Sequence, residues 1–333
     1  MNYKSKSKDI RIVNLRALAI LLVVFGHSVI LYQNGWGLYS TDVDVPMLDL
    51  MKRWIDLIQM PLFFSLSGYL FRFTYERGIS FIVLIKKKAK RLLIPFICFA
   101  FLWMLPIRLF VGYSGYIGST AWQIAIEDII LGNDCGHLWF LQCLFLCFVL
   151  TFVMLKMLDK MRVRNVCKCI IIFVIAWICA YFFYLIPTFP GSEIFRAVAM
   201  NWIWFFCGYV FSVAGHKIEA FHTAKWLLLV VAIICSATSL LNIMPYARVA
   251  KMVLLLTCYA FVPNRTNRIL ELISENSFGI YLFHSPLVYI TYSQIPNAAP
   301  IIIVMLNFVI LGGCSLDLSV IIRRTRGKIV LGE

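Results

Sequence analysis

The fold of this chain is decided by its segment from Asn14 to His27, which reads NLRALAILLVVFGH. The segment lies in an apolar run long enough to enter a membrane, yet it contains Arg16 and His27. Eleven helical steps of about 100° come to roughly three turns, so both side chains lie on one face, about 16 Å apart along the axis. Charged and titratable groups are costly inside a bilayer, so we expect both to face a protein interior and to have a function.

Composition favours a membrane protein over soluble domains. The 333 residues are 62% hydrophobic and 14% charged, and their mean hydropathy of +0.86 is far above that of a soluble domain. A net charge of +15 would suggest nucleic-acid binding in a soluble protein. Here Lys and Arg cluster between apolar runs, as the positive-inside rule describes. We therefore expect one polytopic domain among membrane lipids and no nucleic-acid partner.

The eleven cysteines are scattered along the chain, and no Cys-x-x-Cys pair occurs. Most of them lie inside apolar runs. This pattern is typical of small buried hydrophobic residues rather than of a disulfide framework or a zinc site. The sequence therefore predicts no metal site.

Ten apolar runs of about twenty residues alternate with polar segments, and each is long enough for one membrane-spanning helix. Helices are expected because a backbone in lipid must satisfy its own hydrogen bonds. We predict an all-α polytopic protein with about ten transmembrane helices, and with both termini cytoplasmic because the even-numbered loops carry most basic residues. No cleavable signal peptide is expected. The predicted tails are 1–9 and 323–333, the transmembrane domain is 10–322, and the spans are 10–32, 46–73, 91–111, 137–156, 168–187, 195–214, 225–242, 247–262, 277–293 and 299–321.

Two histidines are expected near the middle of the membrane. His27 lies past the midpoint of the first span, and His284 reaches a similar depth in the segment SFGIYLFHSP, residues 277–286. They could share one catalytic cavity, or each could be a buried polar residue that hydrogen-bonds a neighbouring helix. Pro286 leaves one backbone carbonyl without its helical donor, and we expect the hydroxyl of Ser285 or Tyr281 to satisfy it.

Five positive charges occupy six positions from Lys86 to Arg91. Several cations at the cytoplasmic mouth suit a nucleotide-like donor with several phosphates. The alternative is a topogenic signal that contacts anionic lipid, and Arg16 could likewise reach the headgroups by snorkelling. The candidate donor-binding residues are Arg16, Lys87, Lys88, Lys90 and Arg91.

The other end of the predicted bundle carries aromatic residues that could bind a sugar. His137 opens the fourth span in the segment GHLWFL, residues 136–141. These side chains could equally form the aromatic belt found at membrane interfaces. The candidate acceptor-binding residues are Trp36, His137 and Trp139, with Trp122 as a further wall residue. In the second span, the small residues Ser65, Ser67 and Gly68 predict close packing against another helix.

Five of these segments occur in an order that resembles the integral-membrane acyltransferase family 3. They are Arg16-x10-His27, the run PLFFSLSGY at 61–69, Lys88-x-x-Arg91 before Pro95, HLWFL at 137–141, and SFGIYLFH at 277–284. Each is loose, but five in order are hard to obtain by chance. The resemblance covers nearly the whole chain and is to stand-alone members without an appended esterase-like domain.

The resemblance implies about ten helices and O-acylation, usually O-acetylation, of bacterial surface glycans. It implies acyl-CoA as the donor on the cytoplasmic side, with the family's Arg and His at Arg16 and His27 and its basic pair at Lys88 and Arg91. The chain departs from the family at Asn14, where many members have an acid. It departs again at Lys88, which replaces the commoner arginine and weakens bidentate contact with phosphate.

These observations lead to one hypothesis and two alternatives. The chain is expected to be a multi-pass protein of a bacterial inner or plasma membrane, moving an acetyl group from acetyl-CoA to a hydroxyl of a glycan or lipid-linked glycan. His27 would be the general base or would carry the acyl group, and His284 would orient the acceptor or stabilise the oxyanion. The alternatives are a flippase for a lipid-linked glycan, without covalent chemistry, and a non-catalytic assembly subunit. The sequence leaves homo-oligomerisation open.

Overall fold

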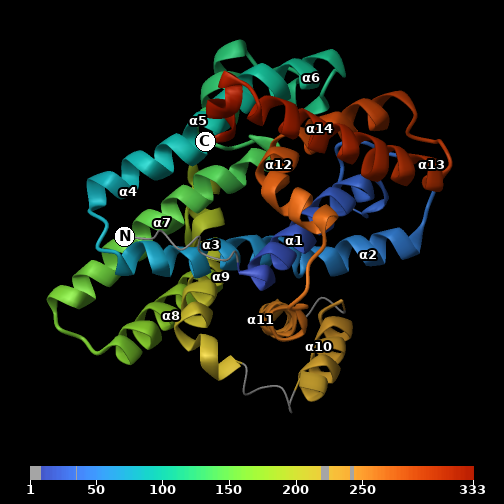
Figure 1. The fold of residues 1–333 in the computed structure, drawn as a ribbon. Helices are drawn as coiled ribbons and strands as arrows, with labels where there is room; N and C mark the ends of the chain where they lie inside the picture. Colours follow the sequence, from blue (N-terminus) through green and yellow to red (C-terminus); the bar gives the residue numbers. More distant parts are fainter. Residues whose placement is uncertain (1–8, 35, 219–224, 241–243) are drawn as a thin grey trace.

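The computed structural model describes residues 9–34, 36–218, 225–240 and 244–333. Helices make up the regular structure of these residues, and no strand occurs among them (Figure 1). This confirms the predicted all-α fold. The predicted tail at 1–8 lies outside the described residues.

Six helical stretches are long and apolar enough to cross a membrane, which supports a multi-pass membrane protein. They are Ile10–Ser28, Pro46–Glu76, Phe81–Phe110, Gly136–Lys160, Ser192–Ala214 and Pro300–Arg323. Two shorter helices, Asn165–Tyr181 and Lys225–Ser239, are also apolar. Each of the ten predicted spans overlaps a helix, while the number of membrane crossings and the side of the termini stay predictions.

The first half of the chain contains α1 (Ile10–Ser28), α2 (Pro46–Asp56), α3 (Gln59–Glu76), α4 (Phe81–Lys88), α5 (Ile94–Phe99), α6 (Leu105–Phe110) and α7 (Trp139–Lys160). The second half contains α8 (Asn165–Tyr181), α9 (Ser192–Ile218), α10 (Lys225–Ser239), α11 (Met244–Phe261), α12 (Arg268–Gln294), α13 (Pro300–Val304) and α14 (Gly312–Arg323). Wider π-helical turns join α4, α5 and α6 and also join α13 to α14. The helices therefore continue across these junctions.

Several predicted spans have different limits in the structure, among them the second, the third and the ninth, whose helix α12 begins nine residues earlier than predicted, at Arg268. The second is divided at Leu57 and Ile58 into α2, which is amphipathic with charged side chains on one face, and α3. The third begins ten residues earlier than predicted, at Phe81, directly after Ser80, whose hydroxyl accepts a hydrogen bond from the Val83 amide. The basic run therefore lies within a continuous helical stretch rather than in a loop before it.

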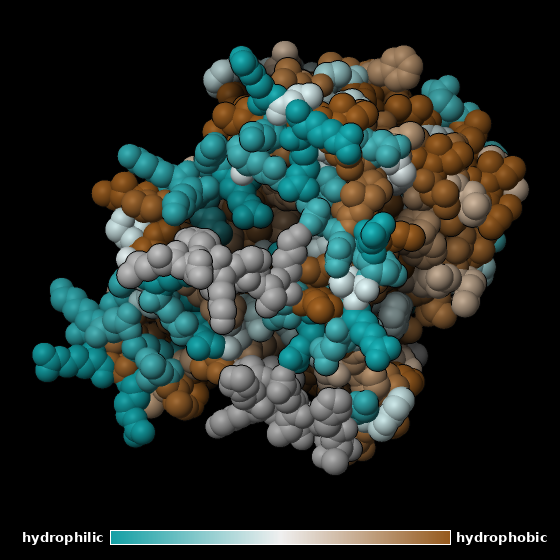
Figure 2. Space-filling model, viewed as in Figure 1, coloured by the Kyte–Doolittle hydropathy of each residue, from teal (hydrophilic) through white to brown (hydrophobic). Residues whose placement is uncertain are grey.

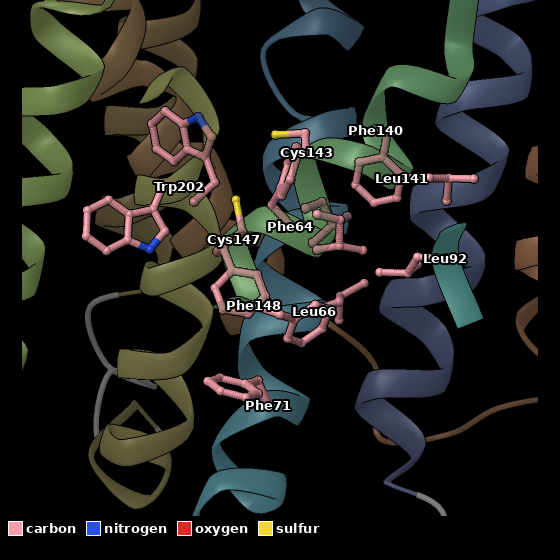
Figure 3. Close-up of a cluster of buried hydrophobic side chains, with 14 of the residues drawn as sticks. Phe64, Leu66, Phe71, Leu92, Phe140, Leu141, Cys143, Cys147, Phe148 and Trp202 are labelled. Atoms are coloured by element: carbon pink, nitrogen blue, oxygen red, sulfur yellow. The ribbon is translucent and has the colours of Figure 1, made fainter. Parts of the chain in front are cut away.

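The core is formed by α3, α7 and α9, with aromatic rings between them (Figure 3). Phe71 of α3 and Phe148 of α7 lie edge to face, with ring centroids 5.4 Å apart. Gly68 and Gly208 let α3 and α9 approach closely, because a Cβ atom at either position would collide with the backbone of the other helix. The predicted close packing at Gly68 is confirmed.

Helix α1 packs along α12 and α3 within the bundle, whereas α10 and α11 pack against each other at the lower edge of the view (Figure 1). Because α1 carries both Arg16 and His27, its neighbours on the bundle side decide what those side chains meet. The helices that matter for the site are α1, α7 and α12, together with the stretch from α4 to α6.

Candidate active site

Three histidines from distant parts of the chain meet inside the bundle. Nδ1 of His27, near the end of α1, lies 2.7 Å from Nε2 of His284 in α12, and the two rings are stacked with centroids 4.9 Å apart. The ring of His137, in the turn before α7, stands edge-on to His284 with a centroid distance of 5.7 Å. His137 and His284 are buried, and His27 is half-buried. The structure thus brings together the two histidines predicted to share a site.

Hydrogen bonds around His284 determine where the neutral imidazoles carry their protons. Nδ1 of His284 lies 3.0 Å from the Ile280 carbonyl oxygen and 2.9 Å from that of Tyr281. Carbonyl oxygens only accept, so this nitrogen carries the hydrogen and Nε2 carries the lone pair. Nε2 therefore accepts from Nδ1–H of His27. The lone pair of neutral His27 is consequently on Nε2, the nitrogen that has no partner within this pair.

The carbonyl freed by Pro286 has a different partner from the one predicted. Pro286 cannot donate to the oxygen of Leu282, and Nε2 of His137 donates to that oxygen instead, at 3.3 Å. The Tyr281 hydroxyl donates to the backbone oxygen of His137. The prediction that Ser285 or Tyr281 serves this carbonyl was wrong, because the turn before α7 brings the ring N–H of His137 to the kink. His137 is therefore a link between α7 and α12 rather than only an interfacial side chain.

A cavity of about 210 Å³ opens beside His27, and we call it the histidine pocket. Three of the predicted acceptor-binding residues, Trp36, His137 and Trp139, line it. Trp122 does not: it is 68% exposed, at the start of a helical segment whose buried side chain is Ile129. The prediction that Trp122 forms part of the wall of this site was therefore wrong. The complete lining is His27, Ile30, Trp36, Leu38, Arg108, Tyr113, Asp134, Gly136, His137, Trp139, Ser285, Val288 and Tyr289.

An ion pair that sequence reasoning missed also lines the histidine pocket. Arg108 of α6 is fully buried, and its Nη2 lies 3.1 Å from Oδ1 of Asp134. The Tyr113 hydroxyl donates to Oδ2 of the same carboxylate at 2.8 Å. Burial raises the pKa of Tyr113, so its hydroxyl keeps the proton that it donates. The signal was present, since an arginine inside an apolar run is by default a candidate functional residue.

A larger cavity of about 570 Å³ lies at the other end of α1, and we call it the basic pocket. Among the predicted donor-binding residues, Arg16, Lys88 and Arg91 line it, together with Arg323. The ammonium of Lys88 lies 3.6 Å from the centre of the Phe148 ring. Figure 2 shows this face of the molecule hollowed near the C-terminus, with hydrophilic side chains around the hollow and hydrophobic ones over α13.

The other two basic candidates lie outside this pocket. Lys87 is exposed and lines a neighbouring cavity of about 660 Å³, which shares Lys88 and Arg91 with the basic pocket. Lys90 is exposed and lines neither cavity. The helical rotation of about 100° per residue separates the five charges, so only part of the run faces the bundle.

Three helices, α1, α7 and α12, contribute residues to both pockets. The side chains between those residues separate the two pockets. On α12, Tyr281 lines the basic pocket and Ser285 the histidine pocket. On and before α7, Phe140 lines the basic pocket and His137 the histidine pocket. The rings of Phe140 and Tyr281 lie edge to face, with centroids 5.5 Å apart. Since α1 places Arg16 and His27 about 16 Å apart along its axis, the two pockets lie at different depths of one bundle.

Asn14 has a structural role near the basic pocket. Its Nδ2 donates to the carbonyl oxygens of Pro263 and Arg265, at 2.9 Å and 2.8 Å. These bonds join α1 to the connection between α11 and α12. An ionised acid at this position could not donate either bond.

Comparison with known proteins identifies one family. A family model described as an acyltransferase domain, of the acyltransferase 3 type, matches residues 9–324. No curated protein and no solved structure matches the chain. Among the described residues, no three His, Cys, Asp or Glu side chains are grouped so that they could hold a metal ion.

Proposed function

The chain belongs to the acyltransferase 3 family and is a membrane acyltransferase, and from this premise we propose that it moves an acetyl group from acetyl-CoA to a hydroxyl of a glycan or lipid-linked glycan. The observation that supports this proposal most directly is the hydrogen bond between His27 and His284. It leaves a lone pair on Nε2 of His27, and His27 lines a pocket. A neutral imidazole held in one orientation is a suitable general base.

In the proposed reaction, the acceptor hydroxyl binds against Nε2 of His27. Its oxygen attacks the thioester carbonyl carbon while His27 takes the hydroxyl proton. The carbon–sulfur bond then breaks, an ester forms, and the departing CoA thiolate takes the proton from His27. Throughout, the lone pair of His284 Nε2 accepts from His27 Nδ1–H and stabilises the transient imidazolium.

His284 acts in this scheme as a positioning residue. Both of its ring nitrogens have partners, one in His27 and one in the carbonyls of Ile280 and Tyr281. It therefore has no hydrogen left for an oxyanion. This geometry favours orientation of His27 over direct contact between His284 and the acceptor.

We place the donor in the basic pocket. Arg16, Lys88 and Arg91 converge there, and charge-assisted hydrogen bonds to several phosphates offset the repulsion between like charges. The acyl end would reach the histidines past the rings of Phe140 and Tyr281, which close that pocket on the histidine side. Arg91 and Lys88 also line the neighbouring cavity with Lys87, so a long donor can extend along this surface.

We place the acceptor in the histidine pocket, whose aromatic and hydroxyl-bearing lining suits a sugar. In the predicted orientation the basic pocket opens to the cytoplasm and the histidine pocket to the opposite side. The protein would then work in a bacterial inner or plasma membrane on a glycan exposed outside the cytoplasm. Its surroundings there are membrane lipids, and no nucleic acid takes part.

The test uses inverted membrane vesicles with either the wild-type protein or His27→Ala, supplied with acetyl-CoA labelled in the acetyl group. Label in the glycan fraction with the wild type alone would support the proposal. Label that accumulates on the wild-type protein but not on His27→Ala would indicate acetylation of His27 as an intermediate. Equal transfer by both proteins would remove His27 from the chemistry.

The flippase alternative differs in one observable. A flippase leaves the mass of its glycan unchanged, whereas acetyl transfer increases it. Wild-type vesicles that move the glycan across the membrane without changing its mass would contradict the proposed function. Tolerance of substitution at both His27 and His284 would favour the non-catalytic assembly subunit.

A further inference from the structure

The ion pair between Arg108 and Asp134 is unusual for its position. Arg108 is fully buried in the stretch Phe81–Phe110, which is apolar enough to span a membrane. Its partner Asp134 is about one-third exposed. A buried ion pair contributes little net stability, because removing both charges from water costs about as much as their attraction returns. Its presence beside His27 therefore calls for a role other than stability.

The guanidinium of Arg108 is not fully satisfied by the protein. Nη1 donates to the Tyr116 hydroxyl at 3.1 Å and to the Asp134 backbone oxygen at 3.0 Å, and Nη2 donates to the Asp134 carboxylate. The buried Nε–H has no acceptor among the described residues. Buried donors are nearly always paired, so this one is expected to meet a ligand or an ordered water.

The charge and shape of the histidine pocket limit what that ligand can be. Arg108 and Asp134 cancel each other, and the other side chains of the lining are neutral when its histidines are neutral. Trp36, Trp139 and Tyr289 line the same pocket, and the centre of the Tyr289 ring lies 5.6 Å from Cζ of Arg108. Aromatic faces pack against the C–H surface of a sugar ring, while an adjacent donor and acceptor match two neighbouring hydroxyls. A neutral polyol is therefore favoured over an anionic or cationic sugar.

The size of the cavity limits the ligand further. At about 210 Å³ the histidine pocket is smaller than the roughly 300–1,000 Å³ of a typical ligand site. A second cavity of about 420 Å³ shares Asp134, Gly136 and Trp139 with it and continues toward Arg196 and Asn201. One sugar ring can thus occupy the histidine pocket while neighbouring units follow the second cavity.

We propose that Arg108 and Asp134 form the recognition site for a neutral hexose unit of the acceptor, holding one of its hydroxyls against His27. This inference rests on the proposed acyl transfer. The Nε–H of Arg108 and the carboxylate of Asp134 bind two ring hydroxyls, and Trp36 packs against the ring. The specificity of the enzyme for a neutral sugar follows from the balanced charge of the pair.

The test compares soluble methyl glycosides on the full-length protein in detergent. The probes are methyl glucoside, methyl galactoside and methyl mannoside, with methyl glucuronide and methyl glucosaminide as charged counterparts. Each is tested as a competitor of labelled acetyl transfer and for thermal stabilisation of the protein without acetyl-CoA. At least one neutral hexoside should inhibit transfer and stabilise the protein at concentrations about tenfold below those of its charged counterparts. A charged ring would be repelled by either Arg108 or Asp134.

Two variants and a matched control locate the effect. Trp36→Ala should raise the inhibition constant of the hexoside about tenfold through lost ring packing, and Asp134→Asn should raise it about 10- to 100-fold. The KM for acetyl-CoA should change less than about twofold in both, because neither residue lines the basic pocket. Trp122→Ala removes an exposed tryptophan outside the pocket and should change neither constant. If Asp134→Asn does not fold, the result for Trp36→Ala alone decides whether the sugar binds in the histidine pocket.

The outcomes separate this inference from the proposed function. Absence of label transfer by the wild-type protein would contradict the proposed function. Thermal stabilisation by a neutral hexoside that is lost in Trp36→Ala would still support the sugar site. A wild-type protein that transfers label but prefers the glucuronide contradicts the inference, and so does one that responds to no hexoside. Unchanged hexoside constants in both variants would also overturn it.

Discussion

The basic pocket and the histidine pocket lie in the same bundle but are built in opposite ways. In the basic pocket, Arg16, Lys88 and Arg91 bring like charges together, while Glu333, in the same lining, pairs with Arg323 at 2.7 Å. At the histidine pocket, His27 ends a chain of hydrogen bonds that begins at the carbonyl of Ile280 and passes through His284, behind the lining. An excess of cations over carboxylates suits the reversible binding of an anion. Paired groups suit chemistry that depends on a single orientation.

The largest expected effect comes from the histidine pocket. His27→Ala removes the proposed base and should lower kcat about 10²- to 10⁴-fold. The KM for acetyl-CoA should stay within about threefold of the wild type, because His27 does not line the basic pocket. Steady-state rates with purified protein measure both constants. A large rise in donor KM would mean that the two pockets are not separate in function.

His284→Ala should have the next largest effect. Without the acceptor at Nε2, His27 loses its preferred tautomer and orientation, and kcat should fall about 10²-fold. In the double variant His27→Ala/His284→Ala, kcat should equal that of His27→Ala alone, because a positioning residue has nothing left to position. A further drop in the double variant would assign His284 an independent contact with the substrate.

Changes in the basic pocket should affect binding rather than the chemical step. Lys88→Ala with Arg91→Ala should raise the KM for acetyl-CoA about 10- to 100-fold, since one charge-assisted bond to phosphate from the less exposed Lys88 is worth about 1.5–3 kcal/mol and the exposed Arg91 adds little. The value of kcat should change little. In the wild type, added salt should raise this KM more steeply than in the variant, because screening weakens exposed charge pairs.

Lys90→Ala is the matched control for that experiment. It removes a positive charge from the same basic run, but Lys90 is exposed and does not line the basic pocket. Its donor KM should stay within about twofold of the wild type. A rise as large as that in the double variant would mean that the whole run acts as a diffuse positive field.

The smallest effect concerns the partition between the pockets. Tyr281→Phe keeps the ring but removes the hydroxyl that donates to the backbone oxygen of His137. One neutral hydrogen bond is worth about 0.5–1.5 kcal/mol, so kcat should fall roughly two- to tenfold. Tyr184→Phe, at an exposed position, is the control and should leave kcat unchanged. An unchanged rate in Tyr281→Phe would show that this bond does not hold His137 in place.

Local sequence was enough for the helices and for part of the site. Hydropathy and helical period depend only on neighbours along the chain, so they predicted an all-α membrane protein and placed Arg16 and His27 on one face of α1. The same information placed His284 at a depth close to that of His27. The family resemblance, now supported over residues 9–324, rested on short motifs of the same kind.

Tertiary structure decided which of these side chains meet. His27 and His284 are 257 positions apart, and the bond from His137 to the Leu282 carbonyl spans 145 positions. Such contacts depend on how α1, α7 and α12 pack, which no local pattern specifies. The pairing of Arg108 with Asp134 has the same origin, as do the outward position of Trp122 and the division of the basic run between two cavities. Periodicity can assign a residue to a face and a depth, but only packing selects its partner across the bundle.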